Sequence, residues 1–239
     1  MIKKMLNKKN IISNVIICSV LCVLGLFIFK INVSQTYLSV SAPLTNGNRD
    51  NDKIGLMFII DDTELANNLT SILKTLDQAQ ISATFFFTGT AAINNLDLLK
   101  KIADNHELGN YGFSNTALNI ADKNTIIEEI QLSDALIKSL VDRQMKFFSP
   151  PKQLFNKHTI AMADHLNYIT VLPTNRNAVI DWKTADSNLV LSYATYNTKN
   201  GDIIALKPTV ATLQCFPQII SSYLINNFKI TSLSNLFQE

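Results

Sequence analysis

Residues that bind metals or form disulfides are scarce in this sequence. Its 239 residues include three histidines and three cysteines, and no Cys/His cluster has metal-ligand spacing. Cys18 and Cys22 lie in an apolar run near the N-terminus, and Cys215 stands alone. The sequence therefore excludes a disulfide framework and a Cys/His metal cluster.

Charge of either sign is also sparse. Asp, Glu, Lys and Arg make up 17% of the residues, and the formal net charge is only +2. Part of the positive charge is concentrated in residues 1–10, which carry four lysines, so the remainder is close to neutral. This composition lacks the basic footprint of a nucleic-acid-binding protein, and we expect no nucleic-acid partner.

A long apolar run follows the basic residues 1–10. It occupies residues 11–29 and ends at Lys30. About 20 apolar residues cross a bilayer as a helix, whereas a cleavable signal has an apolar region of about 7–15. We therefore predict a cytoplasmic basic segment at 1–10 and an uncleaved transmembrane signal-anchor at 11–30, in place of cleavage at Ser39–Ala42 or a buried core helix. Because positive charge stays in the cytoplasm, the C-terminal domain is expected on the outer side of the cell membrane.

The rest of the chain divides into a linker and one domain. Residues 31–52 are polar and irregular and are predicted to be a linker, and residues 53–239 suit a single domain. Apolar runs of strand length alternate with helical stripes there. The expected strands are 54–60, 81–87, 107–111, 146–149, 168–172, 202–206 and 228–232, and the expected helices are 65–78, 96–104, 124–141, 157–165, 187–196 and 213–226. This alternation predicts parallel strands covered by helices, in a (β/α) barrel or a doubly wound sheet.

The first strand ends at two adjacent carboxylates, Asp61 and Asp62. In an α/β barrel, residues at the carboxyl ends of the strands face the mouth where active sites lie. The alternative is an Asp-rich turn in which Asp62 or Thr63 caps the following helix. The sequence of this strand alone leaves both interpretations open.

Further along the chain, short motifs occur in a fixed order. They are Ala-Thr-Phe-Phe at 83–86, Asn-His-Glu-Leu-Gly-Asn at 105–110, Phe-Ser-Pro-Pro at 148–151, Asp-Trp at 181–182 and Gly-Asp-Ile-Ile-Ala-Leu at 201–206. Together with Asp61-Asp62, these motifs resemble those of the polysaccharide deacetylases, the NodB homology domain or carbohydrate esterase family 4. The resemblance covers residues 53–237.

The resemblance implies a distorted (β/α) barrel that removes acetyl groups from glycans such as peptidoglycan or chitin-like polymers. In this family one Asp and two His hold a divalent metal, commonly zinc, which activates a water molecule. The first Asp of the pair acts as the base, and a C-terminal His acts as the general acid. By resemblance, Asp61 holds the base position and Asp62 a metal-ligand position. The implied substrate-binding residues are Pro150, Pro151, Asp181, Trp182 and Leu206.

The sequence departs from the family at the positions that carry the chemistry. Tyr111 and Asn115 replace the two His ligands, Ser149 replaces an Arg, Lys207 replaces the general-acid His, and Thr63 and Glu64 replace a Gly-Pro pair. Zinc sites favour imidazole, thiolate or carboxylate ligands, so Asp62 alone is not enough to hold the ion. The three histidines, His106, His158 and His165, lie away from the family's ligand positions. We expect no metal cofactor.

Lys207 has a second expected role. Its ammonium group is predicted to pair with Asp61 or Asp62 across the mouth, where it would replace the lost metal charge and relieve the repulsion between the carboxylates. The predicted function is a membrane-anchored, catalytically inactive deacetylase-like protein that binds an envelope glycan or a partner protein. The alternatives are an active hydrolase with a divergent centre, with zinc only in that case, and a purely structural envelope protein.

Overall fold

The computed structural model of the protein describes residues 42–61, 66–174 and 185–238. Within them, seven strands form one sheet, and every strand pair is parallel. The strands are β1 (Lys53–Ile60), β2 (Thr84–Phe87), β3 (Glu107–Asn110), β4 (Phe147–Phe148), β5 (Ile169–Thr170), β6 (Ile203–Leu206) and β7 (Lys229–Thr231). Their order is β5-β4-β3-β2-β1-β6, with β7 also paired to β1. The first strand of the sequence is therefore central to the sheet.

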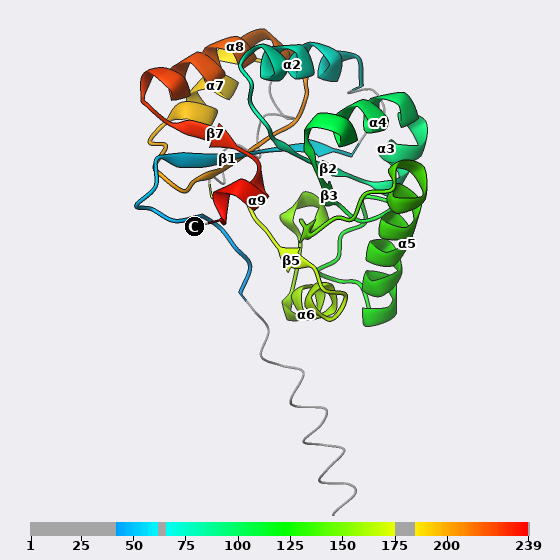
Figure 1. Ribbon diagram of the computed structural model, residues 1–239. Helices are drawn as coiled ribbons and strands as arrows, with labels where there is room; N and C mark the ends of the chain where they lie inside the picture. The colour runs from blue at the N-terminus through cyan, green and yellow to red at the C-terminus, as the bar shows by residue number, and fades with distance from the viewer. Residues whose placement is uncertain (1–41, 62–65, 175–184, 239) are drawn as a thin grey trace, which may run out of the picture. The chain divides into compact units, whose positions relative to one another are not determined.

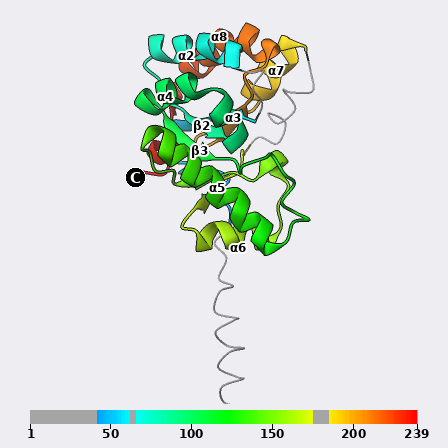
Figure 2. The same ribbon diagram turned by 90° about the vertical axis from the view of Figure 1, so that its right-hand side faces the viewer.

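Helices cover the outer side of this sheet (Figure 1, Figure 2). They are α2 (Ala66–Gln78), α3 (Gly89–Asn94), α4 (Leu96–Asn105), α5 (Lys123–Val141), α6 (Lys157–His165), α7 (Ser187–Thr195) and α8 (Val210–Ile225). The short helix α9 (Leu233–Leu236) packs on the inner side of the sheet, and a 3₁₀ turn occupies Pro151–Gln153. The arrangement is a distorted, open (β/α) barrel, which confirms the fold expected from the sequence. The predicted transmembrane helix at 11–30 lies outside the described residues.

β1 is buried on both faces, which explains its continuous apolar sequence. Successive side chains point to opposite faces of a strand, so Phe58 packs in an outer core beneath the helices and Met57 packs in an inner core inside the barrel. Phe58 stacks on Phe85 of β2 with ring centroids 5.0 Å apart. Burying each such ring stabilises the fold by about 1.5–3 kcal/mol.

The segment before β1 also belongs to the folded domain. The backbone N–H of Leu44 donates to the carbonyl of Thr170 at 2.9 Å, and the N–H of Leu172 donates to the carbonyl of Leu44 at 2.9 Å. These bonds place Leu44 beside the free edge of β5. The Leu44 side chain packs against the inner core.

The same segment then reaches β6. The N–H of Gly47 donates to the carbonyl of Gly201 at 2.7 Å, and Arg49 Nη1 lies 2.5 Å from Asp202 Oδ1. We call residues 44–49 the N-terminal strap, because they bridge β5 and β6, the two ends of the strand order. The folded unit therefore begins before Lys53, and the end of the expected 31–52 linker is part of the barrel.

We expect His106 to make the stability of this domain depend on pH. Its Nδ1 atom accepts a 3.4 Å hydrogen bond from the N–H of Ala83, and its ring centroid lies 5.1 Å from that of Phe85. Burial lowers the pKa of His106, and the nearby charge of Asp77 opposes this shift only in part. The folded state therefore resists protonation that the unfolded state accepts near pH 6.5.

We expect His106→Gln to reduce the loss of stability on acidification. Because the folded-state pKa is depressed, the contribution of His106 is present above about pH 6.5 and is lost as the pH falls below it. Urea unfolding of the wild type and the variant at several pH values between 5 and 8 would measure this. His158→Gln makes the same chemical change on α6 and serves as the control. If both variants changed the pH dependence of the unfolding free energy equally, the effect could not be assigned to the burial of His106.

Candidate active-site cluster

The candidate site lies at the carboxyl ends of the parallel strands. Asp61 directly follows β1, Asn115 lies in the loop after β3, and Lys207 directly follows β6. Phe58 of β1 is in register with Leu206 of β6, so these two strands end side by side. This packing brings together three residues that are far apart in the sequence.

Asp61 is held by two nitrogen donors. Lys207 Nζ lies 2.5 Å from Asp61 Oδ2, and Asn115 Nδ2 donates to the same oxygen at 3.2 Å. Both charged side chains are largely buried, with 14% of Lys207 and 7% of Asp61 exposed. The ion pair predicted across the mouth is confirmed for Asp61. The carboxylate charge is thus neutralised within the protein, where solvent screens it little.

The loop that carries Asn115 is fixed by Glu129 of α5. Glu129 Oε2 accepts hydrogen bonds from the N–H groups of Phe113 at 2.8 Å and Ser114 at 2.9 Å. Asn115 adopts a left-handed backbone conformation, with φ of 59°. Its Oδ1 atom is buried and has no hydrogen-bond partner among the described residues. Sequence reasoning missed Glu129, because nothing in the sequence distinguishes it from the neighbouring Glu128.

Tyr111, at the first substituted ligand position, is a buried neutral phenol. It is 4% exposed, packs in the inner core, and its hydroxyl accepts a 2.9 Å hydrogen bond from the N–H of Lys152. Burial raises the pKa of Tyr111, and the charge of Asp61 raises it further, against the effect of that hydrogen bond. A phenolate ligand for a metal is therefore disfavoured at this position.

The remaining motif residues have structural contacts. Ser149 is 1% exposed, and its N–H donates to the carbonyl of Asn110 at 3.0 Å. Pro150 and Pro151 are buried where the chain leaves β4. Leu206 packs in the outer core, so its side chain contributes to packing between sheet and helices. The other predicted site residues, Asp62, Asp181 and Trp182, lie outside the described residues.

Among the residues that the structure describes, the side chains in contact with Asp61 do not fit a divalent metal. An ammonium group and an amide N–H face its carboxylate, and neither offers a lone pair to a cation. In the part of the chain that the structure describes, no group of three or more His, Cys, Asp or Glu side chains is placed to hold a metal ion. The donor set at Asp61 is therefore that of a hydrogen-bonded ion pair.

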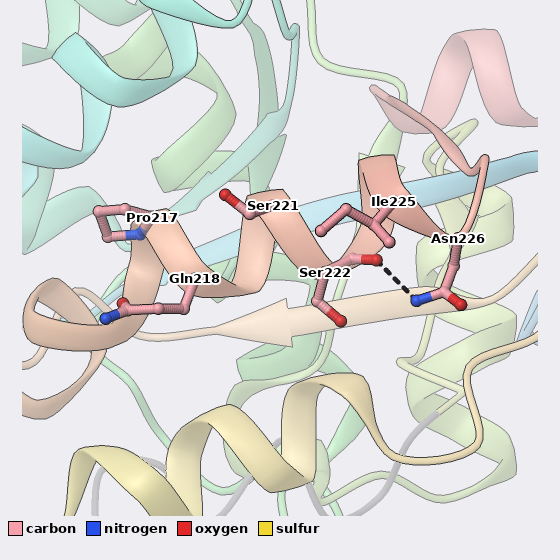
Figure 3. A pocket seen from close by; sticks show the side chains of 6 residues that line it. All are labelled: Pro217, Gln218, Ser221, Ser222, Ile225 and Asn226. Carbon is pink, nitrogen blue, oxygen red and sulfur yellow. Dashed lines mark hydrogen bonds between the residues drawn. The ribbon is translucent and has the colours of Figure 1, made fainter.

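A separate shallow hollow lies on α8. It is lined by Pro217, Gln218, Ser221, Ser222, Ile225 and Asn226 (Figure 3). Asn226 Nδ2 donates to the carbonyl of Ser222 at 2.8 Å and so caps the end of the helix. The lining carries no ionisable side chain, so this hollow offers no acid or base to activate the hydroxyls of Ser221 and Ser222.

The fold and the strand-end site define the class of protein. In (β/α) barrels, active sites lie at the carboxyl ends of the strands, which is where the cluster around Asp61 lies. The family model for polysaccharide deacetylases matches residues 46–171, and the chain belongs to this family. The recognition drawn from the sequence motifs is therefore confirmed.

Two curated relatives illustrate the range of the family. The uncharacterized protein YlxY of Bacillus subtilis is 27% identical over 198 residues, which cover 82% of this chain and 61% of YlxY. The peptidoglycan-N-acetylmuramic acid deacetylase PdaA of Bacillus subtilis is 25% identical over 136 residues, which cover 56% of this chain and 51% of PdaA. The chain thus spans about three fifths of the first relative and half of the second.

Solved structures include a similar protein with altered chemistry. A CE4 family pseudoenzyme from Bacillus anthracis has a TM-score of 0.79 and 25% identity, covering 84% of this chain and 70% of that one. A mutant of that protein, described as having restored enzymatic activity, has the same TM-score and identity, and the match covers 84% of this chain and 73% of the mutant.

No helix among residues 42–61, 66–174 and 185–238 has the length and apolar character to cross a membrane.

Proposed function

We propose that this protein is a catalytically inactive member of the polysaccharide deacetylase family that binds an envelope glycan. Residues 11–30 anchor it in the cell membrane, and the barrel faces outward. The observation that carries the proposal is the contact of 2.5 Å between Lys207 Nζ and Asp61 Oδ2. It engages the carboxylate that would have to act as the base.

Two requirements of the family's chemistry are altered at this site. A general base must hold the water that it deprotonates, and Asp61 Oδ2 is already engaged by an ammonium group and an amide. The family's metal would lower the pKa of that water, but nitrogen donors face Asp61, and Tyr111 is a buried neutral phenol. Hydrolysis of an acetamide by the family's route therefore lacks its metal, and an oxygen of its base is occupied by Lys207 and Asn115.

Binding of glycan is supported by the relatives. A deacetylase that acts on peptidoglycan is among the curated relatives, and a solved neighbour is described as a pseudoenzyme of the same family. A barrel that keeps the family's fold without its metal keeps the scaffold on which the family's members act on glycans. The glycan class that fits this origin is an N-acetylated envelope polysaccharide.

We expect the full chain, purified in detergent, to release no acetate above background from N-acetylated peptidoglycan fragments, with or without added zinc. Asp61→Asn should leave that background unchanged, because Asp61 does not act as a base. Acetate release that Asp61→Asn abolishes would instead identify an active hydrolase with a divergent centre.

The same preparation tests binding. The chain should be retained on insoluble peptidoglycan more strongly than on cellulose, which has no acetamido groups. Absence of retention would contradict glycan binding and leave a protein partner or a structural role. Recovery of the chain in the soluble fraction of its cells would contradict the membrane anchor.

A further inference from the structure

The two positions that would flank a reacting acetyl group are in direct contact in this protein. By family position, Asp61 corresponds to the base and Lys207 to the general acid. An acid and a base each act within about 2.6–3.2 Å of the atoms they serve. With the water and the amide bond between them, the two groups must be roughly 6 Å or more apart. Here Asp61 Oδ2 and Lys207 Nζ are 2.5 Å apart.

We infer that Lys207 is a plug in the acetyl subsite, the space between the carboxylate of Asp61 and the end of β6. This inference rests on the proposed function and adds a steric reason for inactivity to the electrostatic one. The Lys207 side chain extends from the end of β6 to the end of β1 and ends on the carboxylate. No acetamido group fits between the two side chains while that contact holds.

Burial of the pair makes the plug persistent. An exposed ion pair separates at little cost, because water solvates both charges as they part. Lys207 is only 14% exposed and Asp61 only 7%, so water could solvate the separated charges only in part, and separation is costly. Asn115 adds a second donor to the same oxygen at 3.2 Å, and Glu129 holds the loop on which Asn115 lies. A ligand that entered the subsite would have to break this cluster.

The plug therefore predicts where a glycan can bind. An N-acetylated polysaccharide would lie across the outer mouth of the barrel, with no acetyl group reaching Asp61. Removal of the bulk of Lys207 should admit the acetyl group and strengthen binding. Removal of its charge alone should not.

Isothermal titration of an N-acetylglucosamine tetramer into full chains tests this difference. Asp61→Asn/Lys207→Met removes both charges but keeps most of the side-chain volume, and Asp61→Asn/Lys207→Ala removes both charges and the volume. We expect about tenfold tighter binding by the Ala variant than by the Met variant, which should bind like the wild type. Equal affinity of the two variants, both folded by circular dichroism, would overturn the plug. Failure of the wild type to bind would overturn the proposed function instead.

A second pair of variants tests the plug even without measurable glycan binding by the wild type. Tyr111→His/Asn115→His supplies the two missing imidazoles, and a matched protein carries Lys207→Ala as well. Both should bind zinc in a direct titration, and only the protein without Lys207 should then bind acetate, which probes the acetyl subsite without requiring a general acid. Equal acetate binding by both zinc-loaded proteins would overturn the inference.

Discussion

Lys207→Met is expected to lower the free energy of unfolding by about 3 kcal/mol, because it leaves a buried carboxylate without its counter-charge. Asp61 is 7% exposed, so water can rehydrate it only partly after the substitution. Asn115 still donates one hydrogen bond, but an amide does not neutralise a full charge. The uncompensated charge, and not the loss of packing, accounts for most of the effect, since Met has a similar length.

The companion variant separates charge from packing. Asp61→Asn/Lys207→Met removes both charges and should recover a large part of the loss, with a coupling of about 1–3 kcal/mol between the two sites. Urea unfolding of the four proteins in the cycle gives this coupling. Lys152→Met, at an exposed position, is the matched control and should change stability by less than about 0.5 kcal/mol. Additive losses in the cycle would show that the two side chains are not paired in solution.

Gly201→Ala is expected to destabilise the domain by about 3 kcal/mol through the N-terminal strap. Gly201 has a φ of +77°, a conformation that side chains with a Cβ rarely adopt. A Cβ at this position would also lie 2.7 Å from the carbonyl oxygen of Gly47 and 2.9 Å from that of Asn48. These are backbone atoms of the strap, and Gly47 is itself hydrogen-bonded to Gly201, so the strap would have to move away.

Gly112→Ala is the matched control for this substitution. Gly112 has nearly the same φ, +75°, but the nearest atoms to its Cβ are Glu129 Oε2 at 3.1 Å and Pro151 Cγ at 3.3 Å. Glu129 would have to yield slightly, which strains the loop it holds and leaves the strap untouched, so this variant should lose mainly the backbone cost of about 1–2 kcal/mol. Hydrogen exchange should rise in β5 and β6 for Gly201→Ala only. Equal losses and equal exchange in the two variants would show that the strap does not close the barrel.

The strap illustrates a limit of the sequence. Residues 44–49 contain Thr, Asn and Gly and resemble a linker by composition, since no apolar periodicity marks a strand there. They become part of the sheet because β5 and β6 leave backbone groups to be paired at the open side of the barrel. Such pairing depends on partners more than 100 residues away and leaves no local signal.

Short elements were missed for a related reason. α3, with six residues, and α9, with four, are too short for a helical stripe, although Thr88 caps α3 by accepting from the N–H of Ala91. The predicted strand 81–87 begins only at Thr84, where pairing with β1 and β3 starts. The longer helices were placed within a few residues, because their apolar stripes must face the sheet.

The sequence by itself determined the alternation of strands and helices, the family, and the substitutions at the ligand and acid positions. Those features depend on local apolar periodicity and on residue identity at motif positions. Only the tertiary structure decided that Lys207 contacts Asp61 and that Asn115 presents its N–H to the same oxygen. It also decided that Glu129 fixes the loop that carries Asn115. The reason is physical: contacts among the ends of β1, β3 and β6 are made when the strands pair and the sheet curves, and a linear pattern does not specify which side chains then point at one another.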